Sequence, residues 1–294
     1  MSTFRIADKA HIGYVHLRVP DLERSLAFYR DLLGFKEAHR EKKTVFLSAA
    51  DNVPHQIALT EDSKAKPLQR NLPGLFHIAI RFPNRQELAR IFKRVYESQW
   101  RFQGFSDHGV SEALYLADAD GNGIELYADR PRERWIYNNG QLEMFTQTLD
   151  LDNLLKELPQ KDITWNGVHS KTDIGHIHLQ VSDIAKAEKF YHEVLGFDVT
   201  QRNYPGALFV SAGGYHHHVG LNIWNSRGAK ATPKDSLGLQ RFGIELPDEK
   251  SLEQLKKQLT KNSYQFSEEQ LATRKSKSVL LHDLDEIEIE LFVD

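Results

Sequence analysis

Histidine is the residue type that gives this chain its clearest chemical potential. The sequence holds 14 histidines and no cysteine, which excludes disulfides and thiolate chemistry. A metal ion would have to be bound by His, Asp, Glu or Tyr. Residues 181–197 repeat the pattern of residues 19–35, and just upstream Tyr14 stands where His176 stands in the second copy. The second copy can therefore hold a metal at a position where the first copy is poorly suited to do so.

Three consecutive histidines, His216, His217 and His218, suggest a zinc site by their number alone. In a regular strand, neighbouring side chains point to opposite faces, so His217 would face away from the other two. All three cannot bind one ion if the strand is regular. We therefore expect a single inward-facing histidine.

Residues 118–123 read Asp-Ala-Asp-Gly-Asn-Gly, which is similar to the start of a calcium-binding loop. An EF-hand needs further ligands and a Glu at its twelfth position. We instead predict a hairpin turn in which Gly121 and Gly123 supply positive φ angles.

The elements that must position these residues follow one order: strand, helix, strands. Residues 14–19 alternate in character, as a half-buried strand does. Asp21 is placed to cap a helix, apolar residues recur at helical spacing over residues 22–33, and Gly34 ends that helix. Two further strands are predicted at residues 44–48 and 55–60.

A weaker version of this unit follows each copy. The matching first strands are residues 77–83 and 241–247, the helical patterns 86–96 and 252–259, and the closing segments 118–129 and 283–294. Alignment of the closing segments places Glu125 opposite Glu290. A repeat of this length indicates duplicated structural units.

The sequence thus predicts an α+β fold of four βαβββ modules in two tandem domains. Modules one to four lie near residues 11–60, 74–130, 173–225 and 237–294. The N-terminal domain would span residues 1–130 and the C-terminal domain residues 173–294. The linker, residues 131–172, would hold one helix at 142–158, and its length leaves open which modules pair in space.

Composition is that of a soluble globular protein, with 40% hydrophobic and 27% charged residues. The net charge of −3 gives no reason to expect nucleic acid or a membrane surface as a partner. No apolar run has membrane-spanning length and no signal peptide is recognisable, so we expect a cytoplasmic location.

Four βαβββ modules, with His on first strands and Glu on last strands, resemble the vicinal oxygen chelate superfamily. That superfamily includes glyoxalase I, bleomycin-resistance proteins and extradiol ring-cleavage dioxygenases. His108, Tyr115 and Glu125 follow the spacing of the extradiol dioxygenase signature. Ser106, where Gly or Asn is commoner, and Ala119, in place of Pro, depart from it. The overall layout is similar to two-domain catechol 2,3-dioxygenases, which are often homo-oligomers.

The resemblance implies a metal centre of His77, Glu125 and His176, with Fe(II) bound and Mn(II) able to serve the same role. In the best-known members the signature lies in the last module, but here Arg241 occupies the His position of that module. We therefore infer that modules two and three form the metal cup. Modules one and four, with Tyr14 and Arg241, would form a counterpart without metal.

Some neighbouring assignments stay open. His178 lies two residues from His176, on the same strand face, so an error in register would exchange them. Glu290 is expected to be solvated or to pair with Arg241, and His16 to be structural.

The activity that the resemblance implies is extradiol cleavage of catechol, or of a substituted catechol, by O2 to a hydroxymuconic semialdehyde. His217, in a stretch similar to the family's acid–base strand, would move protons, while His108 and Tyr115 would donate hydrogen bonds. The alternatives are a glyoxalase-type isomerase or lyase and a metal-free protein that sequesters an aromatic drug. Candidate aromatic walls for the substrate are Trp100, Phe105, Tyr204, Trp224 and Phe242.

Overall fold

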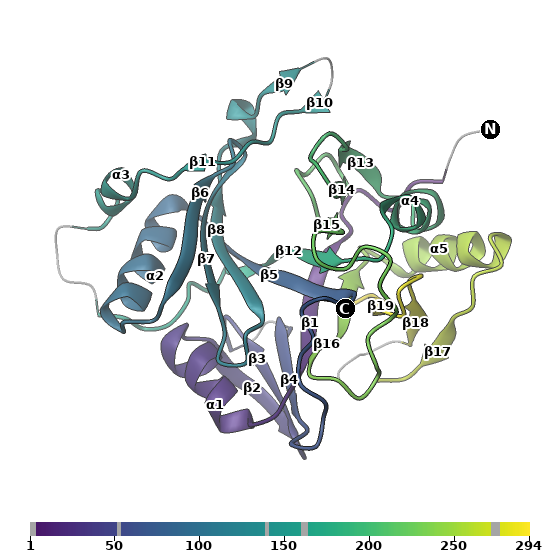
Figure 1. Ribbon diagram of the computed structural model, residues 1–294, viewed down its shortest axis with the longest axis horizontal. Helices are drawn as coiled ribbons and strands as arrows, with labels where there is room; N and C mark the ends of the chain where they lie inside the picture. Colours follow the sequence, from purple (N-terminus) through teal and green to yellow (C-terminus); the bar gives the residue numbers. More distant parts are fainter. Residues whose placement is uncertain (1–3, 52–53, 139–140, 160–163, 272–276) are drawn as a thin grey trace. The chain divides into compact units, whose positions relative to one another are not determined.

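The computed structural model describes residues 4–51, 54–138, 141–159, 164–271 and 277–294. The fold is mixed α+β, as predicted, with sheet predominating over a few helices (Figure 1). Contacts divide the chain into two compact units. Unit 1 comprises residues 1–17, 65–76 and 176–294, and unit 2 comprises residues 18–64 and 77–175. The domains predicted from the sequence are continuous stretches with boundaries at residues 130 and 172, whereas each unit combines separate stretches of the chain. The predicted boundaries remain a proposal.

In module two, the first strand pairs with the last. Strand β5 (Gly74–Phe82) runs parallel to β8 (Gly123–Asp129). Strand β7 (Ser111–Ala117) pairs antiparallel with β8, β6 (Phe102–Asp107) with β7, and the short β11 (Gln147–Thr148) with β6. A residue of the first strand therefore lies beside a residue of the last strand, although the chain between them is long.

Unit 1 contains the same pairing twice. Strand β12 (Asp173–Gln180) is parallel to β15 (Val219–Asn222), and β16 (Gly238–Glu245) is parallel to β19 (Glu288–Phe292). The hairpin strands that complete these modules are β13 (Asp198–Gln201), β14 (Ala207–Ser211), β17 (Ser267–Glu269) and β18 (Ser278–His282). Module one supplies β1 (His11–Val19), β2 (Lys36–Glu41), β3 (Thr44–Ser48) and β4 (Ile57–Glu61), of which the last three pair in order.

A helix follows the first strand of each module, as the apolar spacing predicts. These helices are α1 (Leu22–Leu26), α2 (Arg85–Glu97), α4 (Ile184–Glu188) and α5 (Glu249–Lys261). The predicted Asp21 cap is confirmed, since its side chain accepts a hydrogen bond from the Arg24 backbone N–H. Helices α1 and α4 continue as π-helix, η1 (Ala27–Leu32) and η3 (Lys189–Val194), which a 3.6-residue period does not predict. Gly34 ends the first of them with a φ of 91°.

The tyrosine of each Phe-Tyr pair in the duplicated helices binds a buried aspartate. Tyr29 donates to Asp118 (2.8 Å), and Tyr191 donates to Asp283 (3.0 Å). Asp118 also accepts the backbone N–H groups of its own turn, so residues 118–123 form a hairpin turn rather than a calcium loop. Gly121 has the predicted positive φ of 86°, but the same expectation for Gly123 is wrong, because Gly123 already begins β8.

The prediction of a helix over residues 142–158 is wrong in extent. Only Leu151–Leu155 is helical (α3), capped by Asp150. Residues 147–148 instead pair with the edge of β6, because a free sheet edge offers backbone partners that outweigh local helical preference. The rest of this segment includes η2 (Arg132–Arg134) and a small hairpin of β9 (Tyr137–Asn138) and β10 (Gln141–Leu142).

Among the described residues, no helix combines the length and the apolar character needed to cross a membrane.

The buried Asp283 makes stability depend on pH. Burial raises its pKa from 3.8 to about 7, against hydrogen bonds from the Ile287 and Asp285 N–H groups that lower it. The pKa of Asp283 is higher in the folded protein than in the unfolded chain. Its contribution to the free energy of unfolding is therefore complete below the ordinary Asp pKa and is lost as pH rises through about 7. We expect Asp283→Asn to gain stability relative to wild type between pH 4 and 8, by a few kcal/mol at roughly 1.4 kcal/mol per pKa unit.

Urea unfolding across this pH range measures the effect. Asp152→Asn, at an exposed position in α3, is the control and should leave the pH slope unchanged. A wild-type slope that Asp283→Asn does not reduce would contradict the assignment.

Candidate functional site

His77 and Glu125 lie together in unit 2 on adjacent parallel strands. Glu125 of β8 is directly opposite Ala79 of β5, and His77 is two residues before Ala79, on the same face. The His77 Nε2 atom lies 3.0 Å from Glu125 Oε2, and both side chains are buried. The strand pairing thus brings an imidazole and a carboxylate, distant in sequence, into direct contact.

Tyr115 and His108 extend this pair. Tyr115 of β7 is the antiparallel partner of Glu125, and its ring centroid lies 5.8 Å from that of His77. The Tyr115 hydroxyl is 2.7 Å from His108 Nε2, while His108 Nδ1 is 2.8 Å from the Phe145 carbonyl oxygen. Because a carbonyl only accepts, Nδ1 of His108 must carry a proton, and in a neutral ring Nε2 then accepts from the tyrosine. All four predicted residues of module two are therefore in one cluster.

Ion pairs fix the hairpin that carries His108. Arg130 binds Asp107 at 2.6 Å and Glu112 at 2.9 Å, which joins the end of β6 to the start of β7. Burial alone raises the pKa of Asp107, but hydrogen bonds from Arg130 and the Gly109 N–H outweigh it and leave the pKa lowered. Gly109, with a φ of 77°, makes the tight turn between the strands. The position of His108 is thus determined by charged neighbours and a glycine turn.

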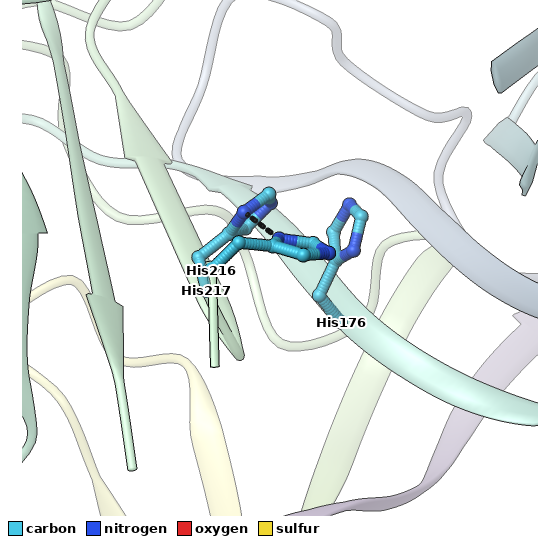
Figure 2. Close-up of side chains that lie close together, drawn as sticks. All are labelled: His176, His216 and His217. Carbon is cyan, nitrogen blue, oxygen red and sulfur yellow. Dashed lines mark hydrogen bonds between the residues drawn. The ribbon is translucent and has the colours of Figure 1, made fainter. Parts of the chain in front are cut away.

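In unit 1, His176 lies with His216 and His217 (Figure 2). The ring centroids of His176 and His217 are 4.0 Å apart, and Nδ1 of His216 is 2.8 Å from Nδ1 of His217. All three side chains are buried, and one ring nitrogen from each lies within 4.8 Å of the others.

The expectation of one inward histidine in the triplet is wrong. Residues 215–218 form a loop that precedes β15 rather than a regular strand, so the two-residue alternation does not apply. His216 and His217 therefore both reach His176. His218 behaves differently, since its Nδ1 lies 3.1 Å from the Ala212 N–H, which donates to it.

His178 has aromatic surroundings instead. Its ring lies 5.1 Å from Phe76, 5.5 Å from Trp224 and 5.7 Å from Phe209, measured between centroids. It is paired in register with Gly220, where a Cβ would meet the imidazole at 3.0 Å. Glycine opposite His178 therefore leaves room for its ring among the aromatic residues.

Two of the five candidate wall aromatics belong to this cluster. Tyr204 and Trp224 contact each other, and Tyr204 also contacts Phe209, which lies 4.9 Å from His217. Phe209 and Phe76 belong to the same cluster, although neither was among the wall residues predicted from the sequence. The other three candidates pack elsewhere: Trp100 against Phe28, Phe105 against Phe92 and Phe102, and Phe242 in the core.

The counterpart of the His77–Glu125 pair lies in unit 1 and has a different chemistry. Gly243 of β16 is directly opposite Glu290 of β19, so Arg241 takes the place of His77. The expectation that Glu290 is solvated is wrong, although its charge does act on Arg241, whose pKa it helps to raise against the opposing effect of burial. Glu290 is fully buried and accepts hydrogen bonds from Tyr14 and from Ser278, the latter at 2.7 Å. The hydrogen bond of Arg241 goes to Glu288, at 2.6 Å, because Glu288 lies directly across the strand pair.

Known proteins share both the sequence and the fold. The family model of the Glyoxalase/Bleomycin resistance protein/Dioxygenase superfamily matches residues 11–126 and 173–291. The chain is 43% identical over 267 residues to the catechol-2,3-dioxygenase of Bacillus subtilis (strain 168), which covers 90% of this chain and 92% of that protein. It is 29% identical over 128 residues to the manganese-dependent 2,3-dihydroxybiphenyl 1,2-dioxygenase of Geobacillus genomosp. 3, covering 42% and 38% respectively. The solved structure of glyoxalase I from Zea mays has the same fold, with a TM-score of 0.61 and 17% identity over 96% of this chain and 92% of that chain.

The two matched segments take in most of the chain, and the similarity to the Bacillus subtilis enzyme runs through nearly all of both proteins. The chain therefore belongs to the Glyoxalase/Bleomycin resistance protein/Dioxygenase superfamily and is one of its ring-cleaving dioxygenases.

Proposed function

We propose that the protein is an Fe(II)-dependent extradiol dioxygenase that cleaves catechol or a substituted catechol with O2 to a hydroxymuconic semialdehyde. The observation that carries the proposal is the buried His77–Glu125 pair with Tyr115 beside it. The 43% identity to a catechol-2,3-dioxygenase supports the same substrate class. A cytoplasmic location and a homo-oligomeric state remain expectations from the sequence and from the resemblance to the family.

The proposed metal ligands are His77, Glu125 and His176. Two imidazoles and a carboxylate suit Fe(II) or Mn(II), and one relative is named as manganese-dependent. When bound, such a metal would hold the catechol and O2 together and would let electron density pass from the ring to O2.

Contacts within unit 2 support His176 as the third ligand. Asp173, at the start of β12, binds Arg81 of β5 at 2.6 Å. The backbone of Gly175 lies so close to the Tyr127 hydroxyl that a side chain there would collide with it. Tyr127 is two residues from Glu125 on β8, and His176 directly follows Gly175. Chain connectivity therefore brings His176 within one residue of a segment that packs against the strands of the other two ligands.

We assign proton transfer to His217. The transfer requires a group that both accepts and releases a proton near neutral pH, which imidazole does. Because Nδ1 of His217 is engaged with His216, proton exchange with the substrate would take place at Nε2. Phe209 packs on the His217 ring and limits its orientation.

Tyr115 and His108 would hold the substrate oxygens by hydrogen bonds. In the neutral state of His108 the tyrosine proton points to His108 Nε2. A second proton on His108 would reverse this bond, and the Tyr115 O–H could then donate to a substrate oxygen. Protonation of His108 would thus allow Tyr115 to donate a hydrogen bond to an oxygen of the bound catechol.

Iron-dependent ring cleavage is the direct test. After anaerobic reconstitution with Fe(II), addition of catechol and air should give a yellow product that requires both metal and O2. Product absorbance and O2 uptake measure the reaction, and metal-free protein is the control. Bound metal without product would favour the glyoxalase-type isomerase, and failure to bind metal would favour the aromatic-binding protein.

Paired substitutions test the ligand assignment. His77→Ala should abolish Fe(II) binding and activity, because it removes one of three ligands. Glu290→Gln, at the equivalent carboxylate of module four, should leave both largely intact while lowering stability, since a buried hydrogen-bonded group is altered. Metal content after dialysis and initial rates measure the outcome, and the reverse pattern would place the metal in module four.

His217→Phe tests the acid–base assignment. The variant should retain bound iron while turnover falls by roughly 10²–10⁴-fold, which is the usual contribution of a general acid–base group. Loss of iron would show that His217 is a ligand. His192→Phe serves as a matched control, because the His192 ring hydrogen-bonds the Phe197 carbonyl oxygen and belongs to neither group of candidate ligands.

A further inference from the structure

We propose that His176, His216 and His217 form a second metal site, which binds Zn²⁺ and overlaps the proposed catalytic site. The inference rests on the proposed function only for the catalytic roles of His176 and His217. The site itself is defined by residues of unit 1 alone. Its occupation by zinc would inactivate the enzyme.

The geometry brings three imidazoles to one point. One ring nitrogen from each histidine lies within 4.8 Å of the other two, and Figure 2 shows the three side chains with the hydrogen bond between His216 and His217 as a dashed line. His216 is fully buried, and His176 is 1% exposed. An ion that enters the group would displace the proton shared by His216 and His217 and would bind their ring nitrogens instead.

The loop that supplies two of these ligands is held in place. Gly213 and Gly214, both with positive φ, turn the chain at the end of β14. Thr200 donates to the His216 carbonyl oxygen at 2.7 Å, and His218 accepts the Ala212 N–H. The two histidines are therefore positioned before an ion arrives, which lowers the entropic cost of binding.

Donor chemistry selects the ion. The proposed catalytic set includes a carboxylate, which suits Fe(II) and Mn(II), whereas three neutral imidazoles suit Zn²⁺, as in catalytic zinc sites that keep an open fourth position. The two sites share His176, so one ion excludes the other through that ligand. A bound zinc also occupies His217 and prevents it from moving protons.

Zinc titration of the metal-free protein tests the proposal. Wild type should bind one Zn²⁺, measured by calorimetry or by competition with a chromophoric chelator. Glu125→Gln should retain this affinity although it loses iron-dependent activity. His216→Asn should weaken zinc at least about tenfold, since even an outer-shell partner contributes 10–100-fold in metal affinity. His192→Asn, whose ring hydrogen-bonds the Phe197 carbonyl oxygen and belongs to neither histidine group, should keep the wild-type affinity, with circular dichroism as the check on folding.

The outcomes separate the two proposals. A Glu125→Gln variant that loses zinc, or a His216→Asn variant that keeps it, would place zinc in the catalytic set and overturn the second site. Simultaneous binding of one iron and one zinc would overturn the overlap. Zinc binding as expected, together with an iron form that does not cleave catechol, would leave the site standing and refute the proposed dioxygenase function.

Discussion

The parallel pairing of the first strand with the last in a βαβββ module is the constraint on which the site depends. It aligns Ala79 with Glu125 in module two and Gly243 with Glu290 in module four. The residue opposite each carboxylate is small, which leaves room for the side chain two positions earlier. That earlier residue is His77 in one module and Arg241 in the other. The fold therefore provides the same position twice, and the residue type decides what each copy does.

A buried carboxylate must have partners, and the duplicated chain provides them in two ways. Glu125 meets the imidazole of His77, while Glu290 accepts hydrogen bonds from Tyr14 and Ser278. Either arrangement satisfies a group whose burial alone would be costly. Only the first offers nitrogen and oxygen donors of the kind that bind iron. The second has the features of a structural hydrogen-bond network.

Irregular backbone gives the chain chemistry that its regular strands do not. The loop before β15 turns two consecutive histidines toward His176, which a strand would not do. The hairpin at Gly109 likewise places His108 against the Tyr115 hydroxyl. Regular strands thus place His77, Glu125 and His176, and the two loops add His108, His216 and His217 beside them.

The sequence by itself determined the module pattern, the helices after each first strand and the candidate residues His77, Glu125, Tyr115 and His108. The period of hydrophobic residues, the capping residues and the internal repeat can all be identified in the sequence without knowledge of tertiary contacts. Tertiary structure decided features that hydrophobic periodicity does not predict. These are the π-helices η1 and η3, the short helix α3 and the contact between His216 and His217. It also decided that Glu290 is buried against Tyr14, because the sequence of a single strand does not show whether an acidic side chain is exposed or buried. Burial and hydrogen bonding depend on partners brought from distant parts of the chain, and only the folded molecule specifies them.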